Sequence, residues 1–341
     1  MEDTLECMEA LMKQSYRDFR IYLVDNGSTD ESPTVLSKKY GTHPKVSLIL
    51  NKENFGFTKG NNEVLIDEIL ANPSYKYVAL LNNDTEPTEY WLDNLVSAAE
   101  REQAAMVSSK MIDYFERDKM DNAGHLMLNT GEILPIGHRV SIKKYNNGFE
   151  NMGACAGAAL YSIAMLKDIG VFDEYFDTGY EDAELGVRTV LSGYKCWYEP
   201  TAVVYHKMGQ SIKKIFNYKY ALRVQKNILY TYFKLIPLGV IIFSLPFLMF
   251  RYFSMITACI LFGQWQYARI LFNALQETFI QDRKLVLEAR KDVSPKVSRI
   301  SSFSFLKRQV FFLRVDLLRF YRFILLRRKS AMDTYGKAQR E

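Results

Sequence analysis

The stretch Tyr77–Pro87 reads YVALLNNDTEP, and the interpretation of the whole chain starts from it. It opens with an apolar run, Tyr77–Leu81, that has the length and composition of a buried parallel strand. The run ends in a polar, acidic cluster, Asn82–Glu86. In an open α/β sheet, ligands bind just beyond the carboxyl ends of the strands. The cluster therefore predicts a site for a hard cation and a phosphate, although Asn, Asp and Pro are also ordinary turn residues.

Charge divides the 341-residue chain into two parts. Residues 1–206 carry 19 Lys/Arg and 32 Asp/Glu, a net charge of −13, whereas residues 207–341 carry 25 and 7, a net charge of +18. This asymmetry predicts two roles, with an anionic partner for the basic part. The four scattered cysteines form no CxxC pair, which argues against a zinc site and fits a reducing cytosol. The first residues are acidic and amphipathic and do not have the pattern of a signal peptide.

Three further stretches carry polar residues where strands meet helices. Phe19–Asp30 reads FRIYLVDNGSTD, a strand followed by a turn that could simply cap the next helix. Asn54–Asn62 reads NFGFTKGNN, where glycines allow a nucleotide to approach the backbone and a helix N-terminus favours phosphate. Glu181–Arg188 reads EDAELGVR and begins a helix, and His206 follows a short strand. Each stretch is weak evidence alone, because capping and turns explain it equally well.

In this order and at these spacings, the four stretches resemble an inverting glycosyltransferase of family 2, most closely the bacterial rhamnosyltransferase-like enzymes of cell-surface polysaccharide assembly. The resemblance covers about the first two-thirds of the chain. It implies an α/β protein with the GT-A (Rossmann-like) fold, in which helices flank a mostly parallel sheet. It also implies one more strand before the helix at residues 3–15, so either the chain begins upstream or it lacks a strand and half of its base pocket.

The resemblance assigns roles to particular residues. It implies a sugar donor linked to a nucleoside diphosphate (dTDP or UDP), a lipid-linked or glycan acceptor, and Mg²⁺ or Mn²⁺ as cofactor. Asp182 would be the general base, with Glu181 as the fallback, and Asp84 and His206 would ligate the metal. The family often has Asp where this chain has Asn82. The expected donor-binding residues are Asp25, Asn54, Gly56, Asn61, Asn82 and Asn83.

A second hypothesis uses the same residues without catalysis. Glu181 and Asp182 could serve only to complement the helix dipole, and lone histidines such as His125 and His138 are more often surface or core residues than ligands. The chain would then be a non-catalytic, GT-A-like binding or scaffold subunit at a membrane. Assaying donor hydrolysis or transfer separates the two hypotheses.

The basic part predicts membrane association. Leu235–Phe250 and Tyr252–Gly263 carry no charge, but Arg251 separates them, which favours an interfacial or re-entrant hairpin over a spanning helix. Phe303–Lys329 reads as one basic amphipathic helix that binds an anionic membrane surface, and no nucleic-acid-binding motif accompanies it. We therefore expect a catalytic domain at 1–210, a helical membrane-associating region at 211–329 and a disordered tail at 330–341, on the cytoplasmic face of the membrane. The basic face comprises Lys307, Arg308, Arg314, Arg319 and Arg322.

Overall fold

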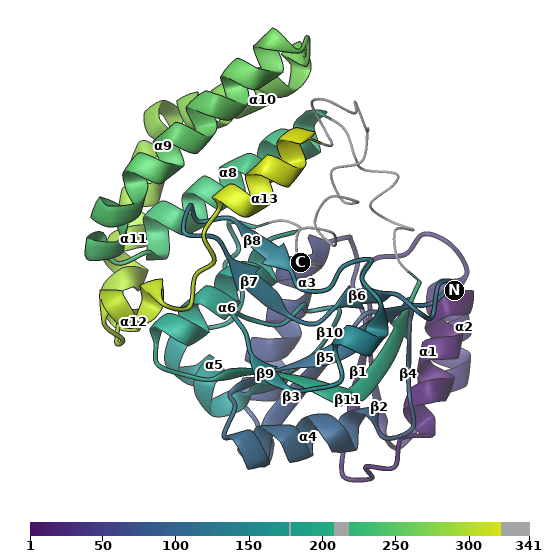
Figure 1. The fold of residues 1–341 in the computed structure, drawn as a ribbon. Helices are drawn as coiled ribbons and strands as arrows, with labels where there is room; N and C mark the ends of the chain where they lie inside the picture. Colours follow the sequence, from purple (N-terminus) through teal and green to yellow (C-terminus); the bar gives the residue numbers. More distant parts are fainter. Residues whose placement is uncertain (177–178, 208–217, 322–341) are drawn as a thin grey trace.

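The computed structural model describes residues 1–176, 179–207 and 218–321, and Figure 1 shows their arrangement. The chain begins with a small α/β unit in which two helices cover a parallel pair of strands. Ile21 pairs with Val46 and Asp25 with Leu50, so the two strands end together. Met8, Leu36 and Tyr40 fill the space between helices and strands. The elements are α1 (Glu2–Met12), β1 (Ile21–Asp25), α2 (Ser32–Tyr40) and β2 (Val46–Leu50).

A second, larger sheet forms the centre of the molecule, in the order β3-β10-β5-β11-β4. β3, β5 and β11 run in the same direction, whereas β10 and β4 run against their neighbours. The expected α/β class is confirmed, but the sheet is mixed rather than mostly parallel, because β10 pairs antiparallel on both of its edges. Its elements are α3 (Gly56–Val64), β3 (Tyr77–Leu81), β4 (Thr85–Pro87), α4 (Trp91–Glu102), β5 (Met106–Asp113), β10 (Ala158–Ser162) and β11 (Cys196–His206).

Among the described residues, shorter strands and two α-helices connect the strands of this sheet. The second of these helices, α6, begins directly after Tyr180. Gly153 and Gly186 let α6 approach the connecting segment closely, since a Cβ built on Gly153 would lie 2.7 Å from the Gly186 Cα. Any larger residue at either position would push the helix outward. The elements are β6 (Met120–Asn122), β7 (His125–Met127), β8 (Ile133–Pro135), β9 (Phe149–Glu150), α5 (Ile163–Ile169) and α6 (Glu181–Leu191).

The last third of the described chain is helical and lies over one end of the sheet domain (Figure 1). Its side chains share one core with that domain: Leu229 and Tyr232 pack in the same cluster as Met106 and Leu185. The two expected regions therefore pack as one body. The helices are α8 (Tyr218–Leu235), α9 (Leu238–Leu261), α10 (Trp265–Gln276), α11 (Arg283–Val297), α12 (Ser302–Leu306) and α13 (Leu313–Arg319).

Two predictions about this region are wrong. The apolar stretch is not a hairpin, because α9 continues through Pro246 and Arg251 as one helix of 24 residues. The segment Phe303–Lys329 does not begin as one continuous helix either: α12 ends at Leu306, and α13 begins only at Leu313. Arg322 and the tail 330–341 lie outside the described residues.

The contacts of Arg251 explain why the charge pattern of the sequence led to these wrong predictions. Its guanidinium is buried and bonds Glu132 Oε2 at 2.5 Å and Asp316 Oδ2 at 2.6 Å. Arg319, assigned from sequence to the basic outer face, also reaches Glu132, at 2.6 Å. The two arginines therefore balance carboxylates inside the protein, and Arg319 does not belong to a lipid-facing surface.

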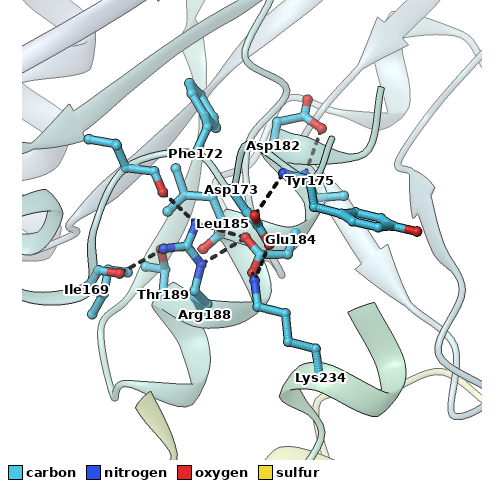
Figure 2. Close-up of polar contacts among 12 residues, drawn as sticks. Ile169, Phe172, Asp173, Tyr175, Asp182, Glu184, Leu185, Arg188, Thr189 and Lys234 are labelled. Atoms are coloured by element: carbon cyan, nitrogen blue, oxygen red, sulfur yellow. Dashed lines mark hydrogen bonds and ion pairs between the residues drawn. The ribbon is translucent and has the colours of Figure 1, made fainter. Parts of the chain in front are cut away.

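A second buried charge network joins α6 to α8 (Figure 2). Lys234 of α8 bonds Glu184 of α6 at 2.5 Å and Asp173 at 2.6 Å. Glu184 also accepts from Arg188, whose other nitrogens donate to the carbonyls of Ile169 and Val171. A buried charge is tolerated only when it is paired and hydrogen-bonded. This network therefore fixes the helix that begins with Glu181 and Asp182 against the C-terminal helices.

Candidate active site

Strand pairing brings Asp84 and His206 together. Thr85 of β4 lies opposite His206, the last residue of β11, so the residue before Thr85 reaches the same end of the sheet. The Asp84 Oδ1 atom lies 3.4 Å from His206 Nε2. The predicted proximity of these two side chains is thus observed, although they are 122 positions apart in the chain.

Asp121 holds the other side of the His206 ring, with its Oδ2 atom 2.7 Å from Nδ1. The same carboxylate lies 3.5 Å from His138 Nδ1. Burial disfavours a charged His206, but its bonds with Asp121 and Asp84 outweigh burial and raise its pKa to about 10. Burial likewise opposes ionisation of Asp121, yet His138 and His206 lower its pKa to about 2. Neither Asp121 nor His138 was among the predicted site residues.

Asp182 lies in the first turn of α6, as predicted. Its Oδ2 atom accepts the backbone N–H of Ala156 at 3.0 Å, and its Oδ1 atom accepts that of Ala183 at 2.7 Å. The buried His125 lies with Nε2 4.0 Å from Oδ2. Burial lowers the pKa of His125, although Asp182 opposes this effect. Asp182 is therefore held by backbone donors next to a buried imidazole, and Glu181 beside it is also buried.

The turn at Ala156 and Gly157 connects the two carboxylate clusters. Ala156 donates to Asp182, and the Gly157 carbonyl accepts the backbone N–H of Asn82 at 2.9 Å. The Cys155 thiol lies between them: burial raises its pKa well above the ordinary value, and Asp182 and Asp121 raise it further. One short turn thus contacts both the candidate base and the first residue of the Asn82–Asp84 cluster.

The expected donor-binding residues form two groups. In the first group, Asn26 connects the residues that were predicted to bind the donor. Its side-chain amide donates to Asn54 Oδ1 at 3.1 Å and to the Gly56 carbonyl at 2.9 Å. Asp25 is buried and accepts the backbone N–H of Ser28. Asn61 bonds back to Phe57 within α3. Asn26 lies within the quoted DNGSTD turn, but its bridging role depends on contacts about 30 positions away that no local pattern reveals.

The second group is the end of β3. Asn82 is half-buried and its carbonyl accepts from Thr85 at 2.6 Å, which makes the tight turn that presents Asp84. The Asn83 amide donates to Thr4 of α1 at 2.8 Å. Asn83 therefore ties the N-terminal helix to this turn.

The donor set at Asp84 and His206 fits a divalent cation in part. It offers one carboxylate oxygen and, once a cation displaces the Nε2 proton that the raised pKa of His206 retains, one imidazole nitrogen. The Asp121 bond to Nδ1 leaves Nε2 facing Asp84. A carboxylate behind a ligating imidazole is the usual support for such a ligand. No cluster of three or more His, Cys, Asp or Glu side chains suited to a metal occurs in the part of the chain that the structure describes. A cation here would need phosphate or water oxygens to complete its coordination.

Comparison with known sequences identifies the class. Residues 2–170 match the model of "Glycosyl transferase family 2". The pre-mycofactocin glycosyltransferase of Mycobacterium tuberculosis is 26% identical over 199 residues, 56% of this chain and 38% of that protein. The O-antigen biosynthesis protein RfbC of Myxococcus xanthus is 24% identical over 203 residues, 55% of this chain and 15% of that protein. The chain thus spans well under half the length of these relatives.

Solved structures agree on the fold. S. aureus TarS 1–349 in complex with UDP-GlcNAc superposes with a TM-score of 0.52 at 16% identity, over 90% of this chain and 89% of that one. GalNAc-T7 with UDP, GalNAc and Mn²⁺ gives 0.51 at 13% identity, over 68% and 45%. The chain therefore belongs to glycosyl transferase family 2 and has the GT-A fold, as the sequence motifs predicted.

Proposed function

We propose that this chain is an inverting, metal-dependent glycosyltransferase that moves a sugar from a dTDP- or UDP-linked donor to a lipid-linked or polysaccharide acceptor in cell-surface glycan synthesis. The arrangement around Ala156 and Gly157 carries the proposal. It holds Asp182 on one side and connects to the cation-binding pair, Asp84 and His206, on the other. Single-step displacement with inversion needs a base and a leaving-group site on opposite sides of the sugar. A rhamnosyl donor is part of this proposal.

Asp84 and His206 would hold Mg²⁺ or Mn²⁺, and the bound cation would neutralise the charge of the departing diphosphate. Asp121 orients the His206 ring through Nδ1 and so directs Nε2 toward Asp84. The Mn²⁺ and UDP bound to GalNAc-T7 support this choice of cofactor and donor class. Because this chain has Asn82 where the family often has Asp, the site carries one negative charge fewer.

Asp182 would take the proton of the acceptor hydroxyl. An alcohol is a weak nucleophile until its proton is removed, and a positioned carboxylate contributes on the order of 10²–10⁴-fold to such a step. The Ala156 and Ala183 amides fix both oxygens of Asp182. The buried His125 lies beside the same carboxylate, with its Nε2 atom 4.0 Å from Asp182 Oδ2.

Asp25, Asn54, Gly56 and Asn61 would form the nucleotide side of the donor site. Asp25 offers a carboxylate for the N–H of a pyrimidine base. Asn26 ties the turn after β1 to the start of α3, and the N-terminus of α3 provides backbone N–H groups for phosphate. Asn82 and Asn83 would border the diphosphate.

The test starts with the purified full chain. A panel of dTDP-, UDP- and GDP-sugars is screened by thermal shift with and without Mn²⁺, and the best donor is assayed for transfer and for hydrolysis. We expect stabilisation by one donor class that requires the cation, followed by turnover. Asp118→Asn, on an exposed loop, is the matched control for carboxylate variants. Donor binding without any transfer or hydrolysis would instead support the non-catalytic subunit.

A further inference from the structure

Helix α9 has its apolar side chains on the outside. Among its large apolar residues, six are more than half exposed, and the helix carries no charged residue besides Arg251. Successive members lie 4, 1, 7, 3 and 8 positions apart, which keeps all of them on one side of the helix. This set of side chains is here called the outer stripe. Its members are Leu238, Ile242, Phe243, Phe250, Phe253 and Leu261.

The opposite side of α9 carries the polar residues and faces the protein. Ser244 is buried and bonds the Tyr232 hydroxyl at 2.6 Å. Arg251 is buried and pairs with Glu132 and Asp316. Val240, Leu248 and Tyr252 are buried beside them, so α9 has apolar side chains on both of its sides, whereas an ordinary surface helix has a polar outer face. An exposed apolar patch of this extent is characteristic of a surface that docks onto another apolar phase.

The net charge of the helical region indicates which apolar phase the outer stripe contacts. Residues 218–321 carry 16 Lys/Arg and five Asp/Glu. The Phe247 ring contacts Phe311, which places the segment between α12 and α13 beside the outer stripe. Lys307, Arg308 and Arg314, on α12's end and α13, are exposed. A second copy of this region would bring like charges together, whereas an anionic bilayer complements both the apolar stripe and its basic surroundings.

Arg251 also fixes how α9 meets the bilayer. The helix is about 36 Å long at 1.5 Å per residue, and by length and composition it could cross a membrane. Yet the middle of α9 is bonded to Glu132, in the turn between β7 and β8, and to Asp316 of α13. A spanning pose would draw these carboxylates and the sheet domain into the hydrocarbon, at high cost.

We propose that α9 lies in the plane of an anionic membrane, with the outer stripe inserted at the level of the lipid headgroups and the Arg251 side held by the protein. The chain is then a monotopic membrane protein on the cytoplasmic face. This inference stands on the fold alone and does not require the proposed transfer reaction.

Vesicle flotation of the full chain tests the docking surface. The wild type should float with vesicles of phosphatidylcholine and phosphatidylglycerol and less with phosphatidylcholine alone, and salt should weaken binding. Phe250→Glu/Phe253→Glu should lower the bound fraction by about tenfold or more, because it places two charges in the stripe. Phe115→Glu, 68% exposed and away from α9, is the matched control and should float normally. Circular dichroism checks that all three proteins are folded.

Depth measurements test the orientation. Ile242→Cys, Phe250→Cys and Leu261→Cys are labelled with an environment-sensitive fluorophore and quenched by lipids carrying nitroxides at graded depths. An in-plane α9 gives three similar, shallow depths. A deep Phe250 site between two shallow ends would mean spanning and would overturn the proposal. A different result would assign the outer stripe to a second copy of the chain. In that case the wild type would not float with vesicles, and it would sediment as a dimer without lipid. The Phe250/Phe253 double variant would sediment as a monomer.

Discussion

The ammonium of Lys234 lies 2.5 Å from the Glu184 carboxylate, and neither group is accessible to water. Lys234→Met should remove the cation that Glu184 and Asp173 share, which leaves the buried Glu184 with Arg188 alone and the partly buried Asp173 without this ion pair. We expect a loss of about 3–5 kcal/mol in the free energy of unfolding, measured by urea denaturation. The control is Lys39→Met, which removes the exposed pair with Glu9 and should cost less than about 1 kcal/mol. A Lys234→Met protein as stable as the wild type would show that the network adds nothing to stability.

Glu132 should make the stability depend on acidity. Burial alone would raise its pKa, but Arg251 and Arg319 outweigh burial and lower it to about 2. Since the folded pKa is below the unfolded value, Glu132 stabilises the fold above roughly pH 4.5, and this contribution is lost as the pH falls toward 2. The difference in unfolding free energy between wild type and Glu132→Gln should therefore be about 3 kcal/mol near neutral pH and shrink on acidification. A difference that is independent of pH would contradict the assignment.

Asp84→Ala should abolish cation-dependent donor binding. It removes one of the two proposed cation ligands and leaves His206 alone, so a cation should no longer be held there to bind the diphosphate. Titration calorimetry of the donor with and without Mn²⁺ measures the effect. Asp118→Asn should behave as the wild type, and an Asp84→Ala protein with unchanged affinity in Mn²⁺ would remove Asp84 from the site.

Asp121→Asn tests a positioning residue that the sequence did not reveal. An amide cannot hold the His206 ring through Nδ1 as a carboxylate does, so Mn²⁺ affinity should fall by about 10–100-fold. Donor binding measured without metal should stay unchanged, and this distinguishes a positioning role from general damage to the fold. Equal losses in both titrations would point to a structural role only.

Asp182→Asn keeps size and polarity but cannot accept a proton. Transfer should drop by on the order of 10²–10⁴-fold while donor and Mn²⁺ affinities remain. Near-normal turnover would exclude Asp182 as the base. If Glu181→Gln is inactive while Asp182→Asn is active, Glu181 is the general base instead.

Local patterns predicted the strand ends and helix starts well, because each is encoded within a few residues. The strand Tyr77–Leu81 was predicted with its observed bounds, and α6 begins at Glu181 as expected. The pairing of Asp84 with His206 followed from the family resemblance. Asp121 could not be found this way, because it meets His206 across 85 positions through sheet geometry alone.

Charged residues in the last third were harder to interpret. A helical wheel groups Arg319 with Arg314, but it cannot tell which of them has a buried carboxylate to meet. Glu132, which lies almost 190 positions before Arg319, decides that question. Glu132 also pairs with Arg251. In the sequence Arg251 separates two apolar stretches, but in the structure it lies within one continuous helix and binds that helix to the sheet domain.

The network in Figure 2 also bears on how the chain folds during synthesis. Glu184 leaves the ribosome 50 residues ahead of Lys234, and Asp173 leaves 61 residues ahead. Until α8 has emerged, α6 lacks the Lys234 ammonium and part of its apolar core. The sheet domain therefore reaches its final form only late in translation. For the same reason, an expression fragment that ends near His206 should be insoluble, so the smallest useful fragment must extend through α8.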